Sequence, residues 1–147
     1  MNIVKTLAIT FALLGYGAGA IAAESTSQVI KHQAPRGITT TFYACIDKAG
    51  SDTVATGACL SAEKQTQDTR LNTAYKALLA KLKDKAKDEL IAAERAWLDF
   101  HHKNGDFEAT LYGDASVADL QVTQNEIFGL CERANALEKY LSIANDQ

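Results

Sequence analysis

The sequence predicts an all-α fold, and three observations support this prediction. Apolar residues recur every three or four positions from Leu71 to Phe100, and again from Val117 to Leu141, as in amphipathic helices. Neither Gly nor Pro interrupts residues 61–103. No stretch alternates polar and apolar residues with the period of two that marks a half-buried strand. We therefore expect a small helical domain over residues 42–144, in which a long helix packs against an antiparallel C-terminal helix.

The first 23 residues have the pattern of a secretory signal peptide. Lys5 supplies a positive charge, Thr6 to Gly15 is a short apolar run, and residues 20–22 form a small-residue cleavage site. The run is shorter than the about 20 apolar residues that a membrane-spanning helix needs. A buried N-terminal helix is the weaker alternative. We expect a periplasmic or secreted protein without a membrane anchor.

The charge of the chain limits its partners. Cleavage would remove one of the 15 basic residues, Lys5, and none of the 18 acidic ones, so the mature chain would be acidic. An acidic, mixed-charge surface argues against nucleic acid and anionic membranes and is compatible with a basic protein partner.

The segments before the long helix are predicted to be irregular. Residues 24–41 are polar and contain the only proline, Pro35, so we expect a flexible N-terminal extension. Residues 42–48 are expected to form a short helical turn. Residues 49–58, rich in Gly, Ser and Thr, are expected to form a loop.

The long helix is predicted to begin at Ser61, which is a suitable N-cap residue, with Glu63 in the first turn. Its apolar positions are Leu71, Tyr75, Leu78, Leu82, Ala86, Leu90, Ala93, Trp97 and Phe100. Their phase does not slip across the charged segment Lys83–Glu89, which favours a continuous or gently bent helix. A hairpin with its turn in that segment is the alternative.

Gly105 is predicted to end the long helix, and residues 108–116 to form a loop. The last helix is expected over Ser116–Ala144, with Ser116 and Asp119 as a capping box. Its apolar face consists of Val117, Leu120, Ile127, Leu130, Cys131, Ala134, Leu137 and Leu141.

Several motifs resemble those of a known family. Two cysteines about thirteen residues apart precede an E…D..LN..Y pattern, a RAWL segment, and a final helix that carries Arg and Leu. The matching positions are Cys45, Cys59, Glu63, Asp68, Leu71, Asn72, Tyr75, Leu90, Arg95, Trp97, Phe100, Arg133 and Leu137. This pattern is similar to that of the LprI-like lysozyme-inhibitor N-terminal domain, over about Phe42–Leu141. The resemblance implies an exported helical protein, with lysozyme inhibition attributed to some members.

The resemblance also implies which cysteines pair. Cys45 and Cys59 match the family's first pair and are expected to form a disulfide. The family's other pair falls on Gly105 and near Glu126, so Cys131 is left as a free thiol. Because Cys131 lies on an apolar helix face, we expect it to be buried and inert.

Neither a metal site nor an active site is predicted. His101 and His102 are neighbours and point about 100° apart on a helix, so they do not chelate one ion easily, and with Asp99 they fall short of the three or four ligands that are usual. We interpret them as imidazoles near a helix C-terminus. No Ser-His-Asp arrangement, phosphate loop or paired-carboxylate cleft is present, so we expect no enzyme and no cofactor.

The family-motif residues are interpreted as structural. Trp97 is in phase with Leu90 and Phe100, which favours core packing over a stacking platform for a ligand. The polar members Asp68, Asn72, Arg95 and Arg133 are predicted to lie at helix contacts, with ion pairs between helices, rather than to bind a ligand.

The predicted function is binding of another protein, for which the resemblance suggests a lysozyme. The alternative is a periplasmic structural or stress-related accessory protein without lysozyme contact. The predicted binding segment is 105–116, which has no basic residue. It offers the acids Glu108 and Asp114 and the aromatic side chains of Phe107 and Tyr112. The alternative for this segment is a solvated connector whose aromatic rings pack onto the helices.

Overall fold

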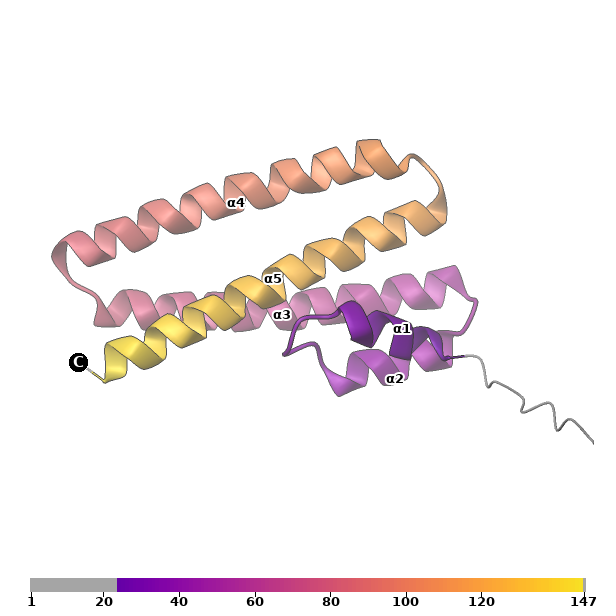
Figure 1. Ribbon diagram of the computed structural model, residues 1–147, viewed down its shortest axis with the longest axis horizontal. Helices are drawn as coiled ribbons and strands as arrows, with labels where there is room; N and C mark the ends of the chain where they lie inside the picture. The colour runs from indigo at the N-terminus through magenta and orange to yellow at the C-terminus, as the bar shows by residue number, and fades with distance from the viewer. Residues whose placement is uncertain (1–23, 147) are drawn as a thin grey trace, which may run out of the picture.

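The computed structural model describes residues 24–146, and over this range it contains five α-helices and no strand (Figure 1). The helices are α1 (Thr26–Gln33), α2 (Thr40–Ala49), α3 (Thr53–Lys81), α4 (Asp84–Tyr112) and α5 (Ser116–Asn145). The all-α prediction is confirmed. The predicted signal peptide, residues 1–23, lies outside the described residues.

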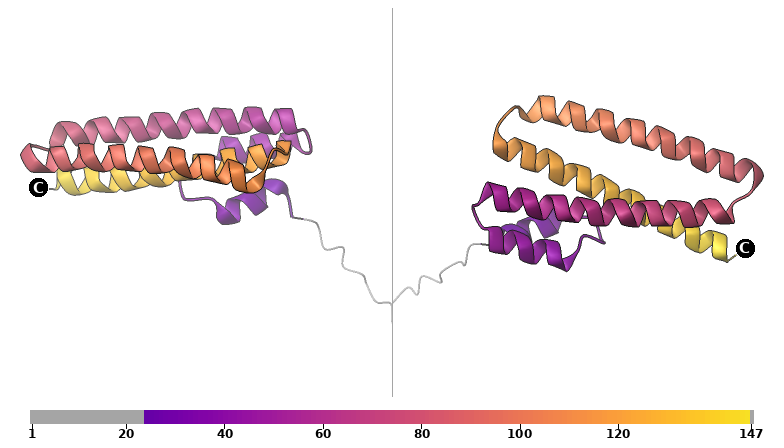
Figure 2. Two further views of the ribbon diagram at one scale, coloured as in Figure 1. Left: turned by 90° about the horizontal axis from the view of Figure 1, so that it is seen from above. Right: turned by 180° about the vertical axis from the view of Figure 1, so that it is seen from behind.

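Three long helices make up most of the molecule, and α4 runs antiparallel to both α3 and α5 (Figure 1). α3, α4 and α5 run side by side along its long axis, as the view from above in Figure 2 shows. α5 packs mainly against α3 and less extensively against α4. The short helices α1 and α2 pack on each other and, through α2, on α3, near the end at which α4 turns into α5. Among residues 24–146, no helix is long and apolar enough to cross a membrane.

The long segment folds back as a hairpin, so the favoured continuous helix is wrong and the alternative is correct. α3 ends at Lys81, Leu82 and Lys83 are extended, and Asp84 adopts a φ of 49°, in the left-handed region. Asp tolerates this conformation better than most residues. A continuous helix would carry half of its apolar stripe away from α5, whereas the hairpin lets both halves pack on it. Tertiary burial therefore overrides the unbroken helical pattern.

The start of α3 also differs from the prediction. The helix begins at Thr53, inside the predicted loop 49–58, because the Oδ1 atom of Asp52 accepts hydrogen bonds from the N–H groups of Val54 (2.9 Å) and Ala55 (3.0 Å). Ser61 is not the N-cap; its hydroxyl donates to the carbonyl of Gly57 at 2.9 Å within the helix. A strong Asp cap thus compensates for a first turn that is poor in helix formers.

Residues 24–41 are not a flexible extension. They include α1, and Ile38 in the segment that follows it is buried. The buried carboxylate of Glu63 on α3 accepts hydrogen bonds from the backbone N–H of Thr39 (3.0 Å) and from its hydroxyl (2.5 Å). The side-chain amide of Gln67 donates to the same carboxylate (2.7 Å) and to the carbonyl of Gly37 (2.9 Å). These bonds fix the connection between α1 and α2.

Two apolar clusters divide the core along the long axis. The first joins α2 and the start of α3 to α5 and consists of Ile38, Phe42, Ile46, Cys59, Leu60, Ile127 and Cys131. The second joins α3, α4 and the end of α5 and consists of Leu71, Ala74, Leu78, Leu90, Leu130, Ala134 and Leu137. Four predicted stripe positions are instead exposed: Ala86, Ala93, Phe100 and Val117. α5 contributes to both clusters and is the central helix of the fold.

The cysteines behave as the resemblance implied. Cys45 on α2 and Cys59 on α3 form a disulfide, which ties the short helices to the long ones. Cys131 is free and buried. Burial raises the pKa of the Cys131 thiol, although the neighbouring guanidinium of Arg70 acts in the opposite direction. The Arg70 Nη1 atom lies 3.6 Å from Sγ, which in turn lies 3.4 Å from the carbonyl oxygen of Arg36.

We expect the Cys131 thiol to be unreactive in the folded protein. A thiol reagent acts on the exposed thiolate, and here the side chain is buried and its pKa is raised. A colorimetric thiol assay near neutral pH should detect no thiol before unfolding and one thiol per chain in denaturant. Rapid labelling of the native protein would contradict this burial.

The last two helices meet in a shorter turn than predicted. α4 continues through Gly105 and ends at Tyr112. Its C-cap is Gly113, whose φ of 81° suits glycine and whose N–H donates to the carbonyl of Ala109. Most of the predicted loop 108–116 is therefore helical. α5 agrees with its predicted range, but Ala115 is its N-cap and no side chain caps it, so the predicted capping box is absent.

Candidate functional site

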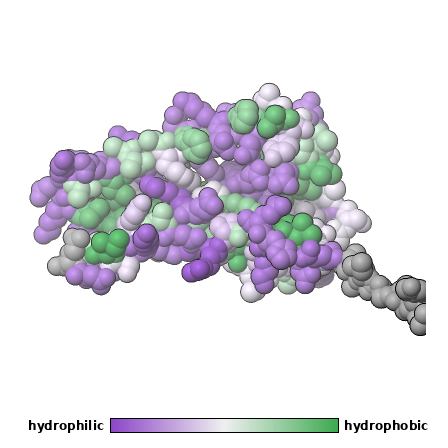
Figure 3. Space-filling view, in the orientation of Figure 1, coloured by the Kyte–Doolittle hydropathy of each residue, from purple (hydrophilic) through white to green (hydrophobic). Residues whose placement is uncertain are grey.

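α4 is the least buried of the long helices, and this exposes the features from which a site can be built. Only Leu90 and Glu94 on α4 are buried. Its exposed large apolar residues are Leu98, Phe100, Phe107, Leu111 and Tyr112. Figure 3 shows apolar side chains at the surface over the end of α4, surrounded by hydrophilic ones. Because α4 packs loosely on its neighbours, cavities open on both sides of it.

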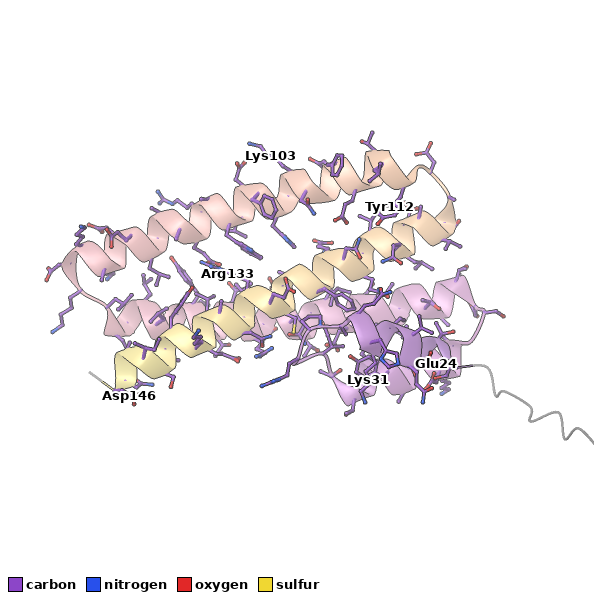
Figure 4. The ribbon with its side chains drawn as sticks, in the orientation of Figure 1. Glu24, Lys31, Lys103, Tyr112, Arg133 and Asp146 are labelled. Atoms are coloured by element: carbon purple, nitrogen blue, oxygen red, sulfur yellow. A yellow bond between two sulfur atoms is a disulfide. The ribbon has the colours of Figure 1, made fainter. Side chains whose placement is uncertain are left out.

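A buried ion pair attaches α4 to α5. Arg133 Nε and Nη2 donate to Glu94 Oε2 at 2.9 and 2.6 Å. The side chains of Arg133 and Glu94 are 14% and 7% exposed. In Figure 4, Arg133 extends from α5 toward α4. The prediction of ion pairs between helices holds for Arg133, but its partner is Glu94, which sequence reasoning did not include. The sequence does contain a pattern that predicts burial of Glu94, because Glu94 lies in helical phase with Leu90 and Trp97 on the buried stripe.

The other family-motif residues surround one cavity between α3 and α4, with a volume of about 380 Å³. Its lining consists of Asp68, Leu71, Asn72, Tyr75, Ile91, Glu94, Arg95, Trp97, Leu98 and Leu130. Asp68, Asn72 and Arg95 are exposed at its rim. Among the described residues, neither Asp68 nor Arg95 forms a salt bridge. These three side chains thus lie together where α3 faces α4, and among the described residues the ion pairs between helices do not involve Asp68 or Arg95.

Trp97 separates this cavity from a second one, between α4 and α5, of about 440 Å³. Its ring stacks on His101 with centroids 4.7 Å apart and planes 18° apart, and the Arg133 guanidinium carbon lies 5.7 Å from its centroid. The indole is only partly buried. Trp97 was predicted to pack in the core, but only part of its side chain is buried. The same side chain lines both cavities.

His101 is held inside the helix interface, not near a helix C-terminus as predicted. Its side chain is 11% exposed and packs on Gly129 of α5, where an added Cβ would lie 3.1 Å from the imidazole. Burial lowers the pKa of His101, while Glu126, 4.0 Å away, acts in the opposite direction. His102 is exposed. Among residues 24–146 no three His, Cys, Asp or Glu side chains are grouped to hold a metal.

His101 should make the stability of the domain depend on pH. Its folded pKa is lowered, so below about pH 6.5, the unfolded value, the unfolded chain binds more protons than the folded one. The free energy of unfolding should therefore fall as the pH drops from about 7 through the folded pKa. The groups around the imidazole are Glu126, His102, Lys64 and Glu108.

Urea unfolding at a series of pH values measures this dependence. The variant His101→Gln should lose less stability over the same pH range than the wild type. The matched control is His102→Gln, which removes the exposed neighbouring imidazole and should retain the wild-type dependence. Equal pH dependence in wild type and His101→Gln would assign the effect to other groups.

The predicted partner-binding residues lie at the α4–α5 turn. Phe107 and Tyr112 are 60% and 48% exposed on the last turns of α4, and Asp114 lies in the turn itself. Figure 4 shows Tyr112 at this end of the molecule. The connector alternative has both rings packed onto the helices, but about half or more of each side chain is exposed. Glu108 differs from the other three because it is half-buried and accepts hydrogen bonds from Asn104 (2.8 Å) and Asn125 (3.0 Å).

The charges within the α4–α5 turn segment have one sign. Residues 104–120 contain Asp106, Glu108, Asp114 and Asp119 but no Lys or Arg. The nearest preceding base, Lys103, bonds to Asp99 at 2.9 Å and points away from α5 (Figure 4). The turn therefore presents exposed apolar groups within an acidic field.

A sequence model of the family described as lysozyme inhibitor LprI matches residues 45–138. The chain belongs to the LprI lysozyme-inhibitor family. The matched range includes the disulfide, the Glu94–Arg133 ion pair, both cavities beside Trp97 and the α4–α5 turn. Comparison with curated proteins and with solved structures found no match. The resemblance predicted from the motifs is confirmed, and LprI membership implies a protein partner.

Proposed function

We propose that this LprI-family protein is an exported, non-enzymatic domain that binds a lysozyme and inhibits it. Membership of the family, over residues 45–138, is the observation that carries the proposal. The signal-peptide pattern of residues 1–23 supports export to the periplasm or the exterior, where lysozymes act.

The binding surface that we propose is the turn surface, defined as Phe107, Leu111, Tyr112, Asp114 and Val117. All five side chains are exposed, and four of them are apolar or aromatic. Exposed apolar groups that lie together and are rimmed by polar residues mark protein interaction sites. Aromatic side chains such as Phe107 and Tyr112 are enriched among the residues that dominate binding energy.

Acidic residues around the turn surface favour a basic enzyme. The carboxylates of Asp106, Asp114 and Asp119 are exposed and have no basic neighbour in residues 104–120. Such a field accelerates encounter with a cationic partner, and salt screens it. Glu108 stabilises the base of this surface, because its hydrogen bond from Asn125 of α5 holds the end of α4 against α5.

The experiment is a lysozyme activity titration with wild type and with the double variant Tyr112→Ala/Asp114→Ala. We expect the wild type to inhibit a basic lysozyme and the double variant to inhibit at least about tenfold less well, since hot-spot side chains contribute more than about 1 kcal/mol each. Circular dichroism should show unchanged helix content, because both side chains are exposed.

A matched control lies at the other end of α5. Tyr140→Ala/Asp146→Ala removes the same two residue types, and Tyr140 is 47% exposed against 48% for Tyr112. This control should inhibit like the wild type. If both double variants inhibit as well as the wild type, the binding surface does not lie at the turn. Absence of inhibition by the wild type would favour the accessory-protein alternative for the enzymes tested.

A further inference from the structure

The cavity between α3 and α4 contains a buried acceptor that the fold leaves free. Both hydrogen bonds from Arg133 go to Oε2 of Glu94. Within the described part of the chain, Oε1 is buried and has no hydrogen-bond partner. Glu94 lines this cavity, whereas Arg133 lines the two neighbouring cavities and not this one. Arg133 therefore holds the carboxylate through Oε2 alone, and within the described residues Oε1 remains a buried, unpaired acceptor on a residue that lines the cavity.

An unpaired carboxylate oxygen at this depth favours a hydrogen-bond donor. The Glu94 side chain is 7% exposed, so water reaches it poorly. Leaving a buried charged acceptor unsatisfied is unfavourable, and a charged donor forms a shorter and stronger bond to it than a neutral one.

Of the charged side chains that line the cavity, Glu94 is the one at the buried end. Asp68 at the rim adds a second carboxylate to that of Glu94. The only basic side chain in the lining is Arg95, which is exposed like Asp68, so water screens both of these charges. At the buried end, Arg133 balances the charge of Glu94 through Oε2, and Oε1 keeps its capacity to accept from a charged donor.

The rest of the lining suits a carbon chain. Four aliphatic side chains and two aromatic rings form the walls: Leu71, Ile91, Leu98, Leu130, Tyr75 and Trp97. The volume of about 380 Å³ lies at the lower end of the range for small-ligand sites. Aromatic rings beside a cation add a favourable electrostatic interaction.

We propose that this cavity binds an alkylammonium group, whose ammonium donates to Glu94 Oε1 while its carbon chain packs on the apolar wall. Two sources present this chemistry, a free aliphatic amine and a lysine side chain of another protein. The site lies on the α3 side of α4, among residues 68–98 and Leu130, and none of its residues belongs to the turn surface. Amine binding and lysozyme inhibition are therefore separate claims that are tested separately.

Trp97 is the only tryptophan in the chain and lines the cavity, so its fluorescence reports occupancy. The full-length mature protein is titrated with n-pentylamine, with 1-pentanol and with pentanoate at about pH 7, where the amine is charged, and at constant ionic strength. We expect saturable binding of pentylamine with a dissociation constant on the order of 1 mM, given its few heavy atoms. Pentanol and pentanoate should bind at least about tenfold more weakly. Equal binding of all three compounds, or no saturable signal with the amine well above that concentration, would overturn the proposal.

Variants of the two carboxylates test whether they cause the binding that Trp97 fluorescence reports. Glu94→Gln keeps the shape but removes the charge and should weaken amine binding at least about tenfold. Asp68→Asn, at the exposed rim, should weaken it roughly two- to fivefold. The matched control Asp88→Asn removes an exposed carboxylate from α4 outside the cavity lining and should change nothing.

If Glu94→Gln does not fold, the compound series on wild type and the Asp68→Asn variant still decide the question. Wild-type affinity in a folded Glu94→Gln protein would refute the assignment. A short peptide with one lysine between glycines distinguishes the two sources. Peptide binding as tight as that of pentylamine assigns a lysine side chain, and amine binding without peptide binding assigns a free amine.

Discussion

Replacing Arg133 with alanine should lower the free energy of unfolding by about 3–5 kcal/mol, because it leaves the buried Glu94 carboxylate without its charged donor. Glu94 is 7% exposed, and both of its hydrogen bonds come from Arg133. Total stabilities of about 5–15 kcal/mol are usual, so the variant should be near the limit of folding at room temperature. Urea unfolding followed by circular dichroism measures the change.

Two further variants separate the ion pair from general effects of substitution. Arg95→Ala removes the exposed guanidinium near the same cavity and should change the stability by less than about 0.5 kcal/mol. The double variant Glu94→Leu/Arg133→Met replaces the pair with apolar groups and should recover most of the loss, since an apolar pair avoids the desolvation of both charges. A wild-type midpoint for Arg133→Ala would show that water satisfies the Glu94 carboxylate.

Removing the disulfide should lower the free energy of unfolding by about 3 kcal/mol, the loop-entropy value for a closed segment of this length. Cys45 and Cys59 are 14 positions apart, and their bond joins α2 to α3. The variant Cys45→Ala/Cys59→Ala, compared with the wild type by thermal unfolding, tests this expectation. Reduced wild type should melt close to the double variant. Identical melting of reduced and oxidised wild type would show that packing of Phe42 and Ile46 alone holds α2.

Helical periodicity predicted the fold class and the C-terminal helix, because a stripe of apolar residues must be buried whatever lies around it. It did not predict where the helices end. The α3–α4 turn contains neither Gly nor Pro, and Asp84 provides the left-handed conformation instead. Gly105 is tolerated within α4, although glycine lowers helix propensity by about 1 kcal/mol. In both places the local sequence pattern does not show where the helix ends.

The candidate site could be predicted only in part. The acidic and aromatic composition of residues 105–116 is visible in the sequence, and so are the motif residues of the LprI family. Their grouping around one cavity depends on the hairpin, which brings Asp68 and Asn72 on α3 next to Arg95 on α4. The pairing of Glu94 with Arg133 requires the register of α4 against α5. Such contacts between distant segments follow from tertiary structure and not from local pattern.

Hydrogen–deuterium exchange with and without a basic lysozyme tests the proposed function most directly, because one measurement reports both binding and its location. Exposed helix ends and turns exchange rapidly when free, so a partner that covers them slows their exchange. Saturating lysozyme should slow exchange over residues 111–118, at the α4–α5 turn. Lysozyme should not change the exchange rate at the α3–α4 turn, residues 82–84. Protection confined to other segments, or no protection at a lysozyme concentration well above that of the protein, would contradict the account.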